Sequence, residues 1–63
     1  MNAKALVISR VGSSWLLSDS DGALCRSDNR NVLSDLLGFV RVRKEVPLEV
    51  VKSRFSQSCT FLR

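Results

Sequence analysis

The first part of the chain consists of short apolar runs separated by turn residues, a pattern typical of β-strands and hairpins. The run Ala5–Val11 is rich in β-branched residues and ends at Gly12, so it predicts a strand. Both of its faces are largely apolar as far as Ser9. We therefore expect this strand at the centre of a sheet or at a subunit interface.

Two more strands are predicted next. Trp15–Leu17 follows the turn residues after Gly12, and Ala23–Arg26 follows the dipeptide Asp21-Gly22. An Asp-Gly pair tolerates the positive φ angles that tight hairpin turns require. The first third of the chain therefore predicts a β-meander.

The apolar period then changes to that of a helix. Apolar residues recur at the spacing of one helical face, at Val32, Leu33, Leu36, Leu37 and Val40. Any of Ser27, Asp28 or Asn29 would cap the beginning of such a helix. Gly38 would end it. A strand over Val32–Leu37 is the alternative, because the segment is short.

Beyond that glycine the apolar residues return to a two-residue period. Valines occupy one side, at Val40, Val42 and Val46. Charged residues occupy the other side, at Arg41, Arg43 and Glu45, and Lys44 interrupts the alternation. This alternation predicts a half-buried strand that presents guanidinium groups to water.

The segment after Pro47 is open to two interpretations. Leu48–Arg54 is favoured as a last strand, because Val50 and Val51 are β-branched and basic residues continue the alternation. The alternative is a short helix with Pro47 at its first position. Its apolar face would consist of Leu48, Val51 and Phe55.

Together these elements predict an α+β fold, mostly β, in which a small antiparallel sheet of four to five strands carries one inserted or covering helix. The 63 residues, of which 44% are hydrophobic, form a single small domain over residues 1–63. A domain of this size barely offsets its chain entropy without disulfides, metal or a second subunit. A homodimer is therefore expected.

Positive charge is concentrated in the last part of the chain. The net charge is +4, yet residues 1–39 hold four Lys or Arg and four Asp, which cancel. Residues 40–63 hold six Lys or Arg and only two Glu. Because the positive charge is confined to one part of the chain, we expect a partner that binds at that part.

Several classes of function are not expected. The chain has no histidine and no tyrosine, and no nucleophile, P-loop or paired-carboxylate motif is present, so it is not predicted to be an enzyme. Cys25 and Cys59 lack the spacing of a metal or redox site and are interpreted as small apolar residues in a reducing compartment. No metal or cofactor is expected. No signal or membrane-spanning run is recognised, so we expect a cytoplasmic protein without a membrane partner.

The remaining chemistry is binding. Guanidinium groups pair with phosphate through two parallel hydrogen bonds and stack on nucleic-acid bases. The predicted strands carry four such residues, Arg10, Arg41, Arg43 and Arg54, and Lys52 adds a further positive charge. RNA is the favoured partner.

Two stretches of the chain resemble the carbon storage regulator (CsrA/RsmA) family. Leu6–Gly12, followed by Leu16–Asp19, is similar to the family's opening L-I-L-(T/S)-R-R strand, its glycine and its second strand. A later stretch is similar to the family's V-R-I…P-x-E-V…R segment. Its matching residues are Val40, Arg41, Val42, Pro47, Glu49, Val50 and Arg54.

The resemblance implies a small β-sheet protein that forms an interlocked homodimer, binds mRNA at GGA-containing hairpin loops and controls translation. It assigns RNA contacts to Ser9, Arg10 and Arg54, and it places Arg10 and Arg54 together at a sheet edge. The chain departs from the family pattern in having one arginine in its first strand, Lys52 and Ser53 before Arg54, and a longer middle that coincides with the predicted helix.

A second hypothesis belongs to another class: a small phage or mobile-element inhibitor or adaptor that binds a host protein. The basic part of the chain would then face an acidic or nucleic-acid-binding surface. Aromatic side chains would anchor that interface, drawn from Trp15, Phe39, Phe55 and Phe61.

Overall fold

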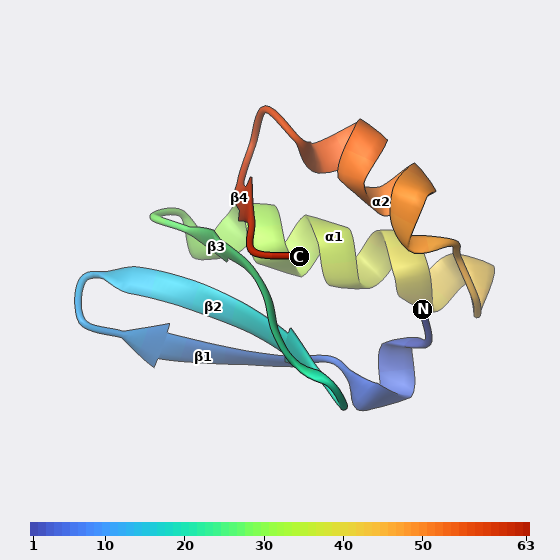
Figure 1. Ribbon diagram of the computed structural model, residues 1–63, viewed down its shortest axis with the longest axis horizontal. Coiled ribbons are helices and arrows are strands. Elements are labelled where there is room, and N and C mark those ends of the chain that lie inside the picture. Colours follow the sequence, from blue (N-terminus) through green and yellow to red (C-terminus); the bar gives the residue numbers. More distant parts are fainter.

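The computed structural model describes all 63 residues and shows one sheet with two helices. Its elements are a 3-10 turn η1 (Ala3–Ala5), strands β1 (Val7–Val11), β2 (Ser14–Asp19) and β3 (Gly22–Ser27), helices α1 (Arg30–Arg43) and α2 (Leu48–Phe55), and strand β4 (Thr60–Phe61). The strands form a four-stranded antiparallel sheet in the order β1-β2-β3-β4 (Figure 1). The predicted α+β class is confirmed.

The predicted β-meander is also confirmed. β1 and β2 are joined by a two-residue turn that begins at Gly12, where φ is +61°, and β2 and β3 are joined by a turn before Gly22, where φ is +116°. Within the second turn the Asp21 amide donates to Asp19 Oδ1 over 2.9 Å. The expectation that the first strand lies at the centre of the sheet is wrong, because successive tight hairpins leave β1 at the edge.

Helix α1 is longer than predicted. Asn29 caps its beginning, with the side-chain oxygen accepting a hydrogen bond from a first-turn amide over 2.9 Å. The helix continues through Gly38 to Arg43, so the predicted end at Gly38 and the predicted strand from Val40 are wrong. The reason is that the apolar stripe extends past the glycine. Its fully buried positions are Leu33, Leu36 and Val40.

The segment after Pro47 is a helix, so the favoured strand is wrong and its alternative is right. Val51 and Phe55 are buried, and Leu48 is partly buried and packs against the core. These residues share one helical face, which packs toward α1. Pro47 itself is the N-cap residue and lies just outside the helix.

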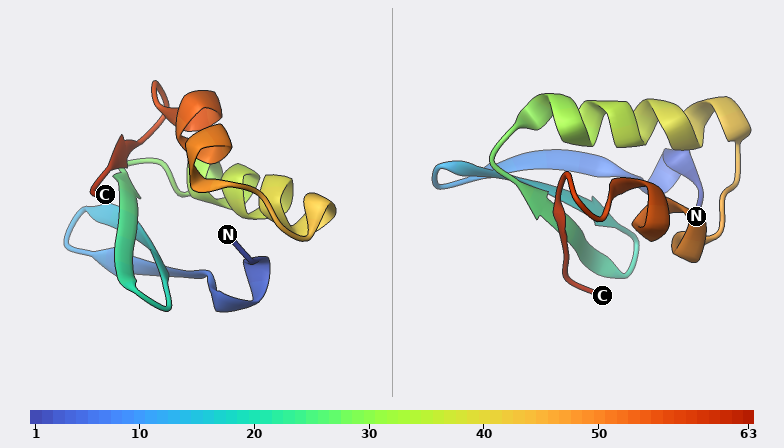
Figure 2. Two further views of the ribbon diagram at one scale, coloured as in Figure 1. Left: turned by 45° about the vertical axis from the view of Figure 1, so that its right-hand side comes forward. Right: turned by 90° about the horizontal axis from the view of Figure 1, so that it is seen from above.

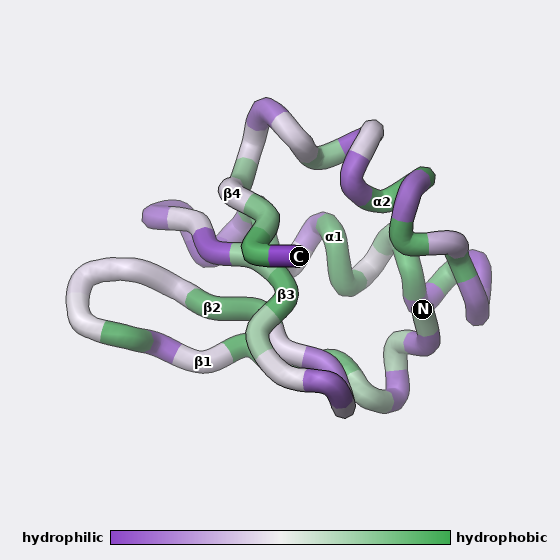
Figure 3. Tube along the Cα trace, in the orientation of Figure 1, coloured by the Kyte–Doolittle hydropathy of each residue, from purple (hydrophilic) through white to green (hydrophobic).

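The hydrophobic core lies between the sheet and the helices. It is one cluster of 11 buried residues from β2, β3, both helices and three connecting positions, which are Leu6, Val46 and Cys59. Both cysteines belong to this core and are free thiols. The sheet and the helices form two layers in the left view of Figure 2, and apolar residues recur along β2, β3, α1 and α2 in Figure 3. Neither helix has the length and apolar character needed to cross a bilayer.

Candidate nucleic-acid-binding surface

The last turn of α1 separates two arginines that a strand would have kept together. Residues two positions apart share a face of a strand but lie on nearly opposite sides of a helix. Arg41 therefore lies on one side of the end of α1 together with Lys44, and Arg43 lies on the other side together with Phe39. The result is two basic hollows that flank the C-terminal end of α1.

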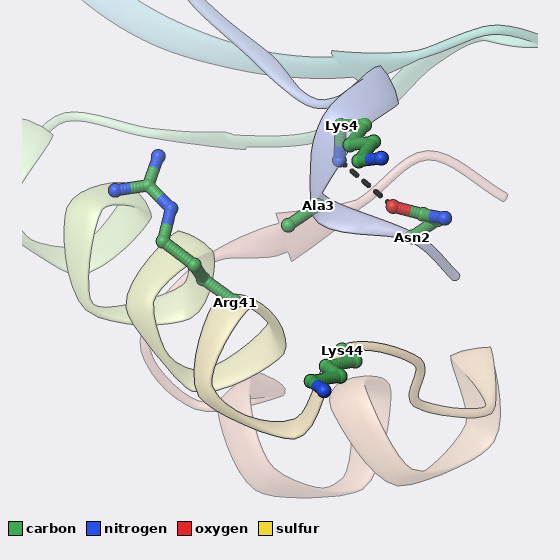
Figure 4. Close-up of a pocket in the computed structure, with 5 residues that line it drawn as sticks. All are labelled: Asn2, Ala3, Lys4, Arg41 and Lys44. Atoms are coloured by element: carbon green, nitrogen blue, oxygen red, sulfur yellow. Dashed lines mark hydrogen bonds between the residues drawn. The ribbon is translucent and has the colours of Figure 1, made fainter.

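The first of these, the η1 hollow, lies between the 3-10 turn and the end of α1. It is lined by Asn2, Ala3, Lys4, Arg41 and Lys44 (Figure 4). Asn2 Oδ1 accepts a hydrogen bond from the Lys4 amide over 2.9 Å, which fixes the beginning of the turn. Three cations thus surround a hollow that no carboxylate lines.

Lys44 has an unusual backbone conformation. It is the only residue other than glycine with a positive φ angle, at +67°, and its ψ is −48°. The Glu45 amide donates to the Arg43 carbonyl over 2.7 Å, which closes a three-residue γ-turn of the rarer, strained kind. Such a conformation costs about 1–3 kcal/mol. The turn ends α1 and lets the Val46 amide reach the Met1 carbonyl, 3.0 Å away, beside the hollow.

The second hollow, the Phe39 hollow, lies between α1 and α2. It is lined by Phe39, Arg43, Glu49, Val50, Ser53 and Arg54. The guanidinium carbon of Arg43 is 3.8 Å from the centroid of the Phe39 ring, and Nη1 donates to the Phe39 carbonyl over 3.2 Å. The guanidinium carbon of Arg54 is 4.9 Å from the same centroid. The Phe55 ring meets Phe39 edge to face at 5.6 Å and supports it from the core side.

None of the cations that line these hollows forms a salt bridge, and each hollow has more basic than acidic residues: three cations line the η1 hollow, and two arginines with Glu49 line the Phe39 hollow. The guanidinium carbons of Arg43 and Arg54 lie 3.8 Å and 4.9 Å from the Phe39 centroid, so their separation is at most the sum of these two distances. This separation is shorter than the electrostatic screening length of about 10 Å at 0.1 M salt, so the two positive charges repel each other. The only ion pairs in the structure are those of Arg63 with Asp19 and with Asp21, the latter at 3.8 Å. Both hollows therefore favour an anion.

The remaining predicted site residues lie elsewhere. Arg10 donates from Nε to the Gly12 carbonyl over 3.1 Å, and its guanidinium carbon is 6.0 Å from the Trp15 centroid. Arg30 approaches the same ring at 5.6 Å. Ser9 is exposed, and its position next to Arg10 in the strand places it on the opposite face of the sheet. Arg10 and Arg30 therefore form a separate surface around Trp15, and Ser9 lies outside it.

Arg54 lies on α2, so the expected meeting of Arg10 and Arg54 at a sheet edge is wrong. The two arginines contact different aromatic rings because residues 48–55 form a helix, not a strand. Lys52 is two positions from Arg54 and therefore lies on nearly the opposite side of α2. Of the predicted residues, the structure brings together only Arg43 and Arg54 in one hollow.

Among the basic and aromatic residues that line the two hollows, three are absent from the predicted RNA-binding residues. Lys4 and Lys44 line the η1 hollow, and Phe39 is the ring on which Arg43 and Arg54 meet. Of these three, only Phe39 could have been recognised from the sequence, because a residue four positions from Arg43 lies on the same side of a helix. That inference was not made because residues 40–43 were predicted to form a strand.

The two thiols are not candidates for chemistry at neutral pH. Burial, together with the neighbouring Cys59, raises the pKa of the Cys25 thiol to about 12. Burial also raises the pKa of Cys59, whose thiol donates to the Phe55 carbonyl over 3.5 Å. A buried thiol that stays protonated is a poor nucleophile.

Comparisons with protein-family models, with curated proteins and with solved structures find no match for this chain.

Proposed function

We propose that this protein is a non-enzymatic, regulatory binding protein that binds single-stranded or hairpin-loop RNA through the η1 hollow and the Phe39 hollow. The observation that supports the proposal best is the meeting of Arg43 and Arg54 at one half-buried aromatic ring, that of Phe39, where neither guanidinium forms a salt bridge. Like charges held this close raise the local potential, and a phosphate between them relieves their repulsion.

The geometry of the Phe39 hollow suits RNA because two kinds of contact are available at one place. A guanidinium donates two parallel hydrogen bonds to a phosphate and offers a flat face on which an unpaired base stacks. Phe39 supports the guanidinium plane of Arg43 from one side, so less side-chain freedom is lost when a ligand binds. Arg54 reaches the same ring from α2.

The η1 hollow adds a second phosphate position. Lys4 and Lys44 carry ammonium groups, which act as point charges without a preferred plane, while Arg41 offers a guanidinium fork. Because both hollows flank the end of α1, a single strand that crosses this end contacts Arg41 and Arg43 in succession. The affinity of such binding comes mainly from contacts with the phosphate backbone, so the association constant falls as the salt concentration rises.

The proposal is tested by titrating a labelled single-stranded RNA of mixed sequence with the protein at several salt concentrations and following fluorescence anisotropy. If all five cations of the two hollows contact phosphates, the logarithm of the association constant falls by about 3.5 for each tenfold rise in salt. The double variant Arg43→Ala/Arg54→Ala lowers that slope by about 1.4, since each contact contributes about 0.7.

Arg26→Ala is the matched control, because Arg26 is an exposed arginine on β3 that lines neither hollow. It leaves the slope nearly unchanged. Absence of RNA binding at about 50 mM salt overturns the proposal and favours a protein partner instead.

A further inference from the structure

Strand β1 is an unprotected sheet edge. It pairs with β2 on one side and with nothing on the other, and no helix covers its free edge (Figures 1 and 2). Natural edge strands are usually blunted by proline, bulges or several charges. β1 has no proline, its pairing with β2 shows no register shift, and its one charge, Arg10, folds back onto the Gly12 carbonyl.

The free edge exposes the backbone groups of alternate residues. The turn between β1 and β2 contains two residues, so its flanking pair, Val11 and Ser14, exchanges hydrogen bonds. Because hydrogen-bonded pairs alternate along an antiparallel ladder, the backbone groups of Ser9 also face β2. The backbone groups of Ile8 and Arg10 then face outward and are free to pair.

The sequence of β1 is self-complementary about its central residue. Val7 and Val11 lie two positions on either side of Ser9, all three on the face of the sheet away from α1. Val7 is 60% exposed and Val11 is 55% exposed, which is high for valines in a strand. An antiparallel copy of the strand centred on Ser9 brings each Val7 beside a Val11 and covers both.

Charge favours the same register. With Ser9 opposite Ser9 of a second copy, each Arg10 lies opposite an Ile8, so no like charges face one another. One neighbouring register of the same parity, with Arg10 opposite Arg10, places two guanidinium groups directly across the junction. The other, with Ile8 opposite Ile8, leaves Val11 without a partner in the second strand. In the favoured register the outward-facing groups of Ile8 and Arg10 also form the hydrogen-bonded pair.

We propose that two copies of this chain associate through their β1 edges, antiparallel and about a twofold axis at Ser9, so that the two sheets become one continuous sheet. The occupant of the edge is a second copy because the edge is complementary to itself. This assembly leaves the two basic hollows outside the junction, and it does not depend on the proposed RNA binding.

The test places a positive charge in one variant, and a negative charge in another, at Ser9 on the proposed twofold axis. Ser9→Lys and Ser9→Glu each place like charges in direct opposition, so each raises the dimer dissociation constant at least about tenfold in sedimentation equilibrium. An equimolar mixture of the two variants restores dimers, because Lys then faces Glu. Ser34→Lys and Ser34→Glu are the controls: they place the same charges on the exposed side of α1, outside the junction, and leave the dissociation constant unchanged.

A wild-type chain that stays monomeric at the highest concentration overturns the proposal, as does a mixture of Ser9 variants that fails to form mixed dimers. A second measurement does not depend on those variants folding well. Ser9→Cys forms a cross-linked dimer on mild oxidation, because two Ser9 residues face each other in the closely spaced kind of pair. Val11→Cys does not cross-link to itself, since its neighbour across the junction is Val7. Equal cross-linking of both variants contradicts the register.

Discussion

The helical course of residues 40–43 separates two valines that a strand would bury alike, and this difference is directly testable. Val40 is fully buried in α1, whereas Val42 is 79% exposed. Val40→Ala removes two buried methyl groups, worth about 1.6 kcal/mol at about 0.8 kcal/mol each, and leaves a small cavity. Alanine returns about 0.5 kcal/mol through its higher helix propensity. The net loss at Val40 is about 1–2 kcal/mol.

At Val42 the burial term is nearly absent and the propensity term remains. Val42→Ala therefore stabilises the protein by about 0.5 kcal/mol, opposite in sign to the change at Val40. Urea unfolding followed by the fluorescence of Trp15, the only tryptophan, measures both free energies. For a domain of this size each kcal/mol corresponds to about 4–8 °C in Tm, so a thermal scan provides a check. Similar losses at both positions would refute the helix and restore the strand.

Three further changes test other parts of the account. Gly38→Ala raises the free energy of unfolding by about 1 kcal/mol, because Gly38 lies inside α1 with no atom within 4 Å of an added Cβ; a decrease, measured by urea unfolding, would indicate that the glycine ends the helix after all. Asn29→Ala lowers it by about 1 kcal/mol through loss of the N-cap, whereas Asn31→Ala, which alters an exposed residue inside the helix, does not. Raising the pH above 9, the ordinary value for a thiol, lowers the free energy of unfolding progressively toward pH 12, because only the unfolded chain releases the Cys25 proton; constant stability over this range would show that the thiol is not held protonated.

Strands β1 to β3 and the first part of α1 were predictable because local signals and tertiary packing agree there, whereas the short strand β4 and the end of α1 were not predicted. The apolar run of β1 and the Asp21-Gly22 turn each indicate one structure, and the fold adopts it. Asn29 is one of three adjacent residues suited to capping, and the fold selects it.

The secondary structure of the second half of the chain could not be assigned from the local sequence, because its apolar residues fit both the two-residue period of a strand and the period of a helix. Val40, Val42 and Val46 fit alternation, whereas Leu33, Leu36 and Val40 fit a helix, and β-branched residues favoured the first reading. The helix prevails since its stripe buries three side chains completely, a gain that exceeds the small propensity cost of valine and of Gly38.

Whether residues 40–43 form a strand or a helix also decides which side chains of the candidate site lie together. As a strand, the segment places Arg41 and Arg43 on one basic face; as a helix, it divides them between two hollows and brings Phe39 beside Arg43. The basic character of the region was visible in the sequence. Its division, and the contributions of Lys4 and Phe39, depend on tertiary structure.

Comparison of Arg54→Ala with Arg26→Ala tests most directly whether RNA binds at defined arginines or to diffuse positive charge. Both remove an exposed arginine, but only Arg54 reaches the Phe39 ring, at 4.9 Å. We expect Arg54→Ala to weaken the binding of single-stranded RNA by about 1–3 kcal/mol, measured by fluorescence anisotropy at fixed salt. Arg26→Ala should cost much less. Equal losses for the two variants would contradict the assignment, even if RNA is bound.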